Sequence, residues 1–320
     1  MTKTELLRQE LKSKGFKIKL ASEIKEDPKL KTGIYVLDYL LDGGIYRGEG
    51  GHRIEFYGKE SSGKTTFTLH VVKQYQLLGK KVIYINAENS YDKVWADMIG
   101  VDNKKLELAY PDSLEQAGDM LVDFIPKYDL IVVDSIPSLI TREEIEGTLE
   151  ENKYMASQAK VLSPMMRKLY CAMEDNFTTI IFINQLREKV GIVYGNPTNT
   201  PGGRALKHFY NTRVEFRLGQ PIEVGTGNDK ERIGYEVHLR CEKNKRGKPH
   251  RSGVVDLYFE GDVDNKKSLL FSGIKFGIIQ QKGAYYTYGE KTGQGKEKFF
   301  ELLSDKDWDK IQEEIWKSVK

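Results

Sequence analysis

Short apolar runs alternate with amphipathic stretches over most of the chain, and this pattern predicts an α/β fold. Continuous apolar runs are typical of parallel strands buried on both faces, whereas apolar positions three and four residues apart indicate helices. We predict strands at 53–57, 81–86, 129–134 and 178–184, helices at 64–78, 112–125 and 158–175, and added strands at 212–218, 235–241 and 254–260. This order favours a largely parallel sheet flanked by helices.

The two ends of the chain differ from this central part. Residues 3–14 place leucines between charges, which predicts a short amphipathic helix, and 25–31 is expected to be a polar connector containing a proline. After about Gly261 the sequence becomes mixed, with a segment rich in Tyr, Gly and Lys and a charged helix predicted at 305–319. We therefore predict three parts: 1–31 as helix and linker, 32–260 as the main domain, and 261–320 as a small α+β domain.

Composition and charge exclude several classes of protein. The 320 residues carry 50 Lys plus Arg and 47 Asp plus Glu, so a histone-like protein is excluded and any nucleic-acid surface must be local. The two cysteines, Cys171 and Cys241, lie far apart, which excludes a disulfide framework or a thiolate zinc site. The N-terminus lacks an apolar signal segment and no apolar run approaches about 18 residues. We expect a cytoplasmic protein without a membrane partner.

The strongest chemical signal is GKESSGKT at residues 58–65, which fits G-x-x-x-x-G-K-[ST]. The backbone N–H groups of such a loop enclose a phosphate, Lys64 reaches the β- and γ-phosphates, and the Thr65 hydroxyl can bind Mg²⁺. A strand precedes the loop and a helix follows it, which favours a nucleotide site over a chance glycine-rich turn. The candidate nucleotide-binding residues here are Gly58, Lys59, Glu60, Ser61, Ser62, Gly63, Lys64, Thr65 and Thr66.

Two carboxylates follow predicted strands at the edge where the phosphate loop lies. Asp134 ends the strand 129–134 and is the candidate magnesium ligand together with Thr65. Its alternative role is to cap the turn at 135–138. Glu88 comes just after the strand 81–86 and is the candidate general base that activates water. An exposed turn glutamate is the other interpretation, and position alone does not separate the two.

Six segments, in order, resemble the bacterial-type RecA recombinase family from about residue 32 to 298. They read GKESSGKTTFTLHVV, YINAENSYD, DLIVVDSIPSLI, IIFINQLREKVGIVYGNPTNTPGGRALKHF, CEKNKRGKP and KGAYYTYGEKTGQGK. The resemblance implies a RecA-like P-loop ATPase core that uses ATP and Mg²⁺. It further implies a DNA-dependent ATPase that forms helical filaments of its own copies on single-stranded DNA and pairs that strand with duplex DNA. The chain ends at Lys320 without the acidic tail common in bacterial members, which would suit a phage version.

The resemblance also implies roles for residues around the nucleotide. Glu88 matches the catalytic glutamate of the family, and Gln185 matches the glutamine that senses the γ-phosphate. Asp92 and Trp95 fall where the family contacts adenine and stacks on it, usually with a tyrosine in place of Trp95. The alternative roles of this pair are a helix cap and a core aromatic.

A pair of lysines is implied to act between subunits. Lys243 and Lys245 match the family pair that reaches the ATP of a neighbouring copy, where cations can neutralise phosphate charge. An i, i+2 spacing on a strand directs both side chains to one face. The alternative for this basic cluster is a solvated surface. The resemblance thus makes Lys64, Glu88, Gln185, Lys243 and Lys245 the candidate catalytic residues.

The candidate DNA contacts lie in two loops and in the C-terminal part. The segment 187–204 is rich in glycine and proline, and a loop of this length is usually functional or disordered. Basic side chains and glycine N–H groups can bind phosphates, and an apolar side chain can insert between bases. The shorter loop at 146–155 matches the second DNA loop of the family. The candidates are Arg187, Val190, Gly202, Gly203, Arg204, Met155, Lys160, Lys282, Lys296 and Lys298.

Two further classes of protein stay open at this point. One is a non-catalytic scaffold that binds ATP and DNA and assists another recombinase. The presence of Glu88, Gln185, Lys243 and Lys245 argues against it, and an ATPase assay separates the two. The other is a replicative helicase with the same core, which would not require the YGEKTGQGK segment and would form rings in place of helical filaments. The predicted helix at 3–14 is the candidate arm that docks on the next subunit of a filament.

Overall fold

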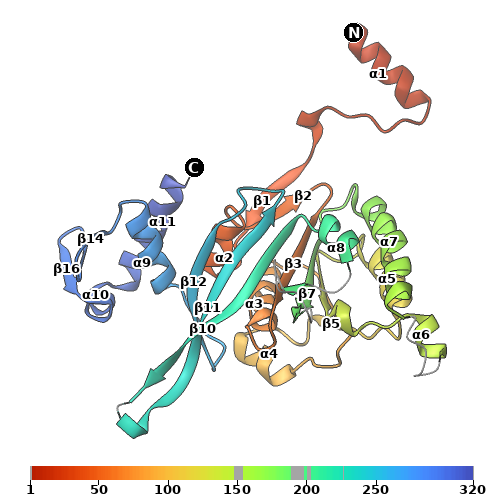
Figure 1. Ribbon diagram of the computed structural model, residues 1–320. Helices are drawn as coiled ribbons and strands as arrows, with labels where there is room; N and C mark the ends of the chain where they lie inside the picture. The colour runs from red at the N-terminus through yellow and green to blue at the C-terminus, as the bar shows by residue number, and fades with distance from the viewer. Residues whose placement is uncertain (1, 148–153, 189–197, 200–202, 226, 320) are drawn as a thin grey trace.

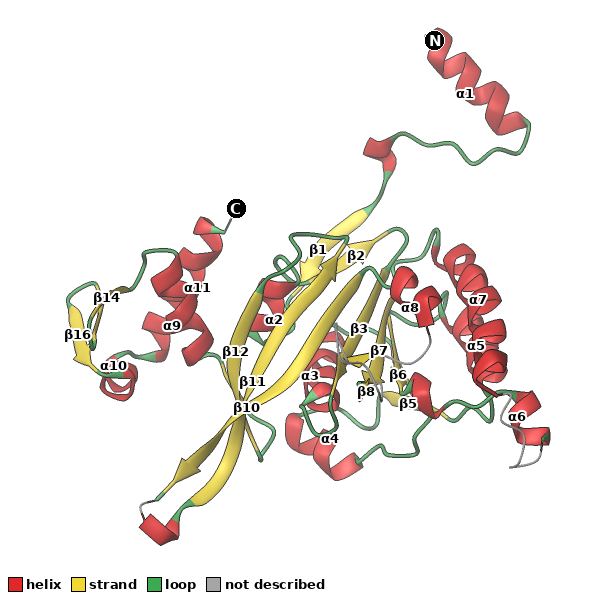
Figure 2. Ribbon diagram, viewed as in Figure 1, coloured by secondary structure: helices red, strands yellow, loops and turns green. Residues whose placement is uncertain are grey.

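The structure is a computed structural model that describes residues 2–147, 154–188, 198–199, 203–225 and 227–319. Nine of its described strands form one large sheet in the order β13-β12-β11-β10-β3-β7-β6-β4-β5 (Figures 1 and 2). The strands from β10 to β5 run parallel to one another, and β11, β12 and β13 are added antiparallel at one edge. The bounds are β3 His52–Gly58, β4 Val82–Asn86, β5 Leu106–Ala109, β6 Leu130–Asp134, β7 Thr179–Gln185, β10 Thr212–Val224, β11 Glu231–Asn244, β12 Ser252–Tyr258 and β13 Val263–Asp264.

Helices cover both faces of this sheet because successive strand residues point to opposite sides. Val132 packs into the core under one set of helices, and Val133 packs into the core under the other. The first face carries α2 Tyr35–Leu40, α3 Lys64–Leu77, α4 Lys93–Ile99 and α9 Lys266–Lys275, and the second carries α5 Leu114–Phe124, α7 Tyr154–Met173 and α8 Gly203–Phe209. A short helix, α6 Arg142–Glu146, lies beyond α5 and α7 (Figure 1). The predicted α/β class is confirmed.

The N-terminal part is a helix and a strand on a long connection. The helix α1 (Lys3–Ser13) is capped by Thr2, buries none of its residues and stands away from the body in Figure 1. The stretch predicted as a polar connector instead contains β1 (Glu26–Leu30), which pairs antiparallel with β2 (Ile45–Gly48). Sequence alone missed this strand because Leu30 is the one buried residue of β1, and its first three residues are exposed.

The C-terminal part is a small α+β unit beside the antiparallel edge of the large sheet (Figure 1). Among its described residues, three short antiparallel strands form a separate sheet in the order β14-β15-β16. Its elements after α9 are β14 Gln280–Lys282, β15 Tyr285–Tyr288, β16 Lys291–Gln294, α10 Lys296–Leu302 and α11 Asp305–Ser318. The large sheet takes its last strand, β13, from residues 263–264, a few residues beyond the predicted boundary at 260.

Several element boundaries differ from those predicted. Sequence analysis missed α4 and β5, and α7 begins at residue 154 where 158 was predicted. The strands β10 and β11 have 13 and 14 residues, about twice the predicted length, and they leave the body as a paired arm (Figure 2). Residues in the outer half of β10 are exposed or half-buried, so they carry no alternating apolar signal. Across the described residues, no helix combines the length and apolar character needed to cross a membrane.

Candidate nucleotide site

The predicted phosphate loop joins the end of β3 to the start of α3, in the middle of the sheet. A Cβ atom at Gly58 would lie 2.3 Å from the carbonyl oxygen of Phe216 and 2.7 Å from the Ser62 hydroxyl oxygen, so only glycine fits there. Gly63 has a φ of +89° and forms the N-cap of α3, a left-handed conformation that favours glycine. The loop therefore folds tightly in front of the helix N-terminus, as a phosphate site requires.

Lys64 lies inside the curve of this loop. Its side chain is buried, and its Nζ donates hydrogen bonds to the carbonyl oxygen of Lys59 at 2.7 Å and to the Ser62 hydroxyl at 3.4 Å. Burial lowers the pKa of Lys64, and the negative charges of Asp134 and Glu88 oppose that shift. The ammonium group is thus held between the loop and two carboxylates.

Asp134 and Thr65 bring two oxygen donors together beside the loop. The Thr65 hydroxyl donates to Asp134 Oδ2 at 3.4 Å, and the Tyr84 hydroxyl donates to the same oxygen at 2.5 Å. Burial raises the pKa of Asp134. Mg²⁺ prefers oxygen ligands and is usually bound through one or two carboxylates together with phosphates and water. A hydroxyl and one carboxylate next to a phosphate loop fit that ion.

Glu88 lies at the same edge of the sheet as Asp134. Its backbone N–H donates to the carbonyl oxygen of Asp134 at 3.2 Å. The Ser135 hydroxyl and the Gln185 side-chain amide both donate to Glu88 Oε1, the amide at 3.3 Å. Among the residues that the structure describes, neither hydrogen bond uses Oε2. An exposed carboxylate held in this way can orient or deprotonate a water molecule.

Gln185 connects this edge to the first predicted DNA loop. It is the last residue of β7 and pairs in register with Gly58 of the phosphate loop. The next residue, Leu186, donates its N–H to the carbonyl oxygen of Gly58 at 3.1 Å. The chain then continues into β8 (Arg187–Glu188), which pairs with β9 (Thr198–Asn199). One residue therefore separates the Glu88 contact from the start of the loop.

Trp95 lies half-buried in a pocket against the phosphate loop. The pocket is lined by Trp95, by residues 61–66, and by Leu218, Tyr235, Leu257, Tyr258 and Phe259. Asp92 caps α4 by accepting the Trp95 N–H at 3.0 Å, which is one of the two roles considered for it. Sequence analysis missed the aromatic wall formed by Tyr235 and Phe259, whose rings lie 5.6 Å apart. No local motif marks these residues, because separate strands bring them to the loop.

The lysine pair lies elsewhere in the same chain. Lys243 pairs with Arg213 near the end of the sheet that is remote from the phosphate loop. Its Nζ donates to the carbonyl oxygens of Lys207 at 2.6 Å and His208 at 3.3 Å. Burial lowers the pKa of Lys243 to about 8, and the positive charges of Lys245 and Arg213 add to that effect. Lys245 is exposed and lies one residue beyond the end of β11, so the predicted strand spacing holds for Lys243 alone.

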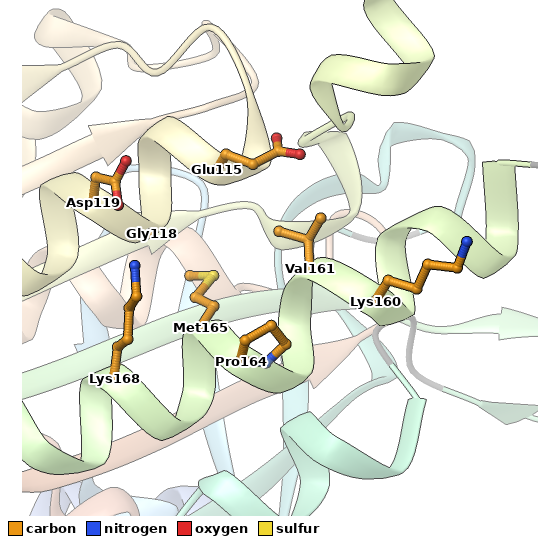
Figure 3. A pocket seen from close by; sticks show the side chains of 8 residues that line it. All are labelled: Glu115, Gly118, Asp119, Lys160, Val161, Pro164, Met165 and Lys168. Atoms are coloured by element: carbon orange, nitrogen blue, oxygen red, sulfur yellow. The ribbon is translucent and has the colours of Figure 1, made fainter.

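The predicted DNA contacts are described only in part. Val190 and Gly202 lie outside the described residues, and Arg187, Gly203, Arg204 and Met155 are described at the level of their elements. Lys160 is exposed on α7 and lines a groove between α5 and α7 (Figure 3). This groove also contains Lys168 on α7 and Glu115 and Asp119 on α5, so lysines line one side of it and carboxylates line the other.

The three C-terminal lysines are exposed. Lys282 lies on β14, and Lys296 and Lys298 lie on α10. The Nζ of Lys296 lies 4.8 Å from the centre of the Phe271 ring. Exposure alone is compatible with a DNA surface and with ordinary solvation.

The fold and the phosphate loop together define the class: a P-loop nucleotide-binding protein with an α/β core. A family model described as the RecA N-terminal domain matches residues 9–264, and one described as the RecA C-terminal domain matches 268–320. The chain belongs to the RecA family. It is therefore an ATP-dependent DNA recombinase and a DNA-dependent ATPase of recombination and repair, which confirms the prediction from sequence.

Individual relatives match most of the chain. A protein named Protein RecA from Frankia casuarinae is 39% identical over 296 residues, which are 91% of this chain and 83% of the relative. Protein RecA from Thermus thermophilus is 39% identical over 283 residues, 87% of this chain and 81% of the relative. Protein RecA from Streptomyces ambofaciens is 37% identical over 313 residues, 96% of this chain and 81% of the relative.

Proposed function

We propose that this recombinase binds ATP and Mg²⁺ at the carboxyl edge of β3, β4, β6 and β7 and uses hydrolysis to loosen a filament on single-stranded DNA. The observation that carries the proposal is the convergence of Lys64, Thr65, Asp134, Glu88 and Gln185 at this one edge. These residues come from four separate strand ends, and ligands of open α/β sheets bind outside such ends.

Each side chain has a defined task in hydrolysis. The loop N–H groups and Lys64 hold the phosphates, and Lys64 stabilises the charge that develops on them. Thr65 and Asp134 hold Mg²⁺, which supplies further charge neutralisation when bound. Glu88 orients the attacking water and accepts its proton, while Ser135 and Gln185 fix the carboxylate through Oε1.

Gln185 couples the nucleotide to DNA. Its side chain lies against Glu88, and its backbone leads into the segment that begins at Arg187. A hydrogen bond from this amide to the γ-phosphate moves Gln185 and repositions the segment that follows it. Such ordering of a segment by a γ-phosphate is a known type of conformational switch. In the bound state Arg187, Val190 and residues 202–204 contact the single strand, together with Met155 and Lys160 from α7.

Filament formation completes the site between copies. Lys243 and Lys245 of one copy bind the phosphates of the nucleotide held by the next, and α1 docks on a neighbouring copy. The absence of buried residues in α1 supports this role, because an amphipathic helix whose apolar side chains are not buried in its own chain is suited to a partner. The part at 261–320 captures duplex DNA through Lys282, Lys296 and Lys298.

Electron microscopy with single-stranded DNA, with and without a non-hydrolysable ATP analogue, tests the proposal. We expect helical filaments that require both DNA and the analogue and that dissolve when ATP is hydrolysed. Closed rings would favour the helicase alternative. Filaments combined with no ATPase activity on DNA would favour the non-catalytic scaffold.

A further inference from the structure

We propose that Tyr84 is a positioning residue for the magnesium carboxylate, Asp134. This inference rests on the proposed function, since it assigns a role toward the same metal. Tyr84 lies in the middle of β4, is 1% exposed, and donates its hydroxyl hydrogen to Asp134 Oδ2 at 2.5 Å. No sequence motif pointed to it.

The strand register explains how this contact forms. In the parallel pair of β4 and β6, Tyr84 lies opposite Val132, and Asn86 lies opposite Asp134. Tyr84 and Asp134 are therefore diagonal neighbours on one face of the sheet, at a spacing that a long aromatic side chain can bridge. The phenol reaches along the strand to the carboxylate at its end.

Tyr84 and Thr65 have different positions around the same carboxylate oxygen. Thr65 is exposed, is the second residue of α3, and has its hydroxyl oxygen 3.4 Å from Asp134 Oδ2. The ring of Tyr84 is fixed in the core, where it packs edge-on against Tyr91 with centroids 5.3 Å apart. Thr65 is itself a proposed Mg²⁺ ligand, so its hydroxyl would turn toward the metal. The Tyr84 phenol is then the donor that keeps the Asp134 carboxylate in one orientation.

The hydroxyl contributes something that a plain ring would not. A phenylalanine at this position would fill nearly the same volume in the core. A buried hydroxyl is costly unless it is hydrogen-bonded, and here its partner is the proposed metal ligand itself. Partners that orient a metal ligand typically change metal affinity by about 10–100-fold when they are removed.

The test is Tyr84→Phe, read out as nucleotide binding and not as turnover. A fluorescent ATP analogue is titrated without DNA while the Mg²⁺ concentration is varied. We expect the half-saturating Mg²⁺ concentration to rise by about tenfold, the lower end of that range. Affinity measured without Mg²⁺ should stay unchanged, because the Tyr84 hydroxyl donates its one hydrogen to Asp134 and not to an atom of the phosphate loop. A loss of affinity that is equal with and without Mg²⁺ would instead indicate general damage and overturn the proposal.

Two control variants isolate the hydroxyl that contacts Asp134. Tyr75→Phe removes another buried hydroxyl, which donates to the Thr179 hydroxyl at 2.7 Å on the same face of the sheet. Tyr91→Phe removes the hydroxyl of the ring that packs on Tyr84, which donates to Asn103 at 2.6 Å. Neither should shift the Mg²⁺ dependence. An equal shift in either control would contradict a specific role for Tyr84.

Two further measurements keep the outcome decisive. In an Asp134→Asn background, Tyr84→Phe should have no additional effect on the Mg²⁺ dependence, because the carboxylate is gone. Tyr84→Met provides a second variant without the hydroxyl if the phenylalanine ring packs poorly, and thermal unfolding verifies that each variant is folded. If wild-type binding does not respond to Mg²⁺ at all, the proposed metal site fails. If wild type responds and Tyr84→Phe matches it, only the role of Tyr84 fails.

Discussion

Two lysines at opposite ends of the central sheet show how a complete site differs from half of a site. In the complete site this chain supplies both signs of charge, whereas half of a site needs an anion from a neighbouring copy. Lys64 and Lys243 both donate to backbone carbonyl oxygens at short distance, at 2.7 Å and 2.6 Å. Burial lowers the pKa of each. The charges around them differ: Asp134 and Glu88 oppose the shift at Lys64, whereas Lys245, Arg213 and Arg53 reinforce it at Lys243.

This contrast indicates where an anion is still needed. The nucleotide pocket contains its own acidic partners, so the chain can position Lys64 by itself. Around Lys243, Glu55 is the acidic group that opposes three cations, and Glu55 is already paired with Arg213. A phosphate brought by a neighbouring copy would supply the missing negative charge, which is the arrangement proposed for the filament.

The largest expected effect is at the complete site. Lys64→Ala should abolish nucleotide binding, and with it ATPase activity and ATP-dependent filaments, because it removes the buried ammonium group that the loop encloses. Lys104→Ala, at an exposed position far from the loop, is the control. ATP hydrolysis by Lys64→Ala at the wild-type rate on single-stranded DNA would refute the assignment of the loop.

The next effect separates chemistry from binding within that site. Glu88→Gln keeps an oxygen that can accept from Ser135 and Gln185 but removes the base. ATP binding should survive, turnover should fall by about a hundredfold, and filaments should live longer. Steady-state ATPase assays and filament lifetimes measure this, with the exposed Glu301→Gln as control. Unchanged turnover would place the base elsewhere.

A third prediction concerns the connection from the complete site to DNA. Gln185→Ala should leave nucleotide affinity without DNA nearly unchanged but remove the gain in DNA affinity that ATP brings. Arg187→Ala should weaken DNA binding with and without ATP and make its salt dependence shallower, because it removes a phosphate contact. DNA affinity is measured against salt with and without an ATP analogue. If Gln185→Ala keeps the full gain, the switch lies with Lys243 and Lys245.

The two regions also differ in how far the sequence predicts them. The phosphate loop and the strand ends at Asp134 and Glu88 follow from local pattern, because a parallel sheet places all carboxyl ends at one edge. The environment of Lys243 could not be foreseen in the same way. Its hydrogen-bond partners come from α8, and its cationic neighbours come from β3, β10 and the turn after β11.

The same limit explains the residues that sequence analysis missed. The sequence identifies Tyr84 only as a residue of an apolar strand, because nothing local shows that its hydroxyl contacts Asp134 across a strand pair. Tyr235 and Phe259 were also overlooked, because the pocket wall they form depends on the pairing of β11 and β12. Patterns along the chain locate strand ends, but contacts across strands require the register.

The smallest and most specific effect is a pair of opposite pH trends at Lys243. The pKa of Lys243 is about 8 in the folded chain and has its ordinary value of 10.5 in the unfolded chain. Between these two pH values the unfolded chain therefore binds more protons than the folded chain. Stability of the free protein should therefore rise with pH across that window, and Lys243→Met should remove this rise.

Filament assembly should show the opposite pH trend. A neighbour's phosphate restores the charged form of Lys243, so assembly takes up a proton above pH 8 and weakens as pH increases. Lys243→Arg, which stays charged, should keep assembly constant over the same range. Thermal unfolding and light scattering from pH 7 to 10 measure the two trends. If wild-type assembly and Lys243→Arg assembly respond identically to pH, Lys243 does not face a phosphate, and the comparison between a complete site and half of one is wrong.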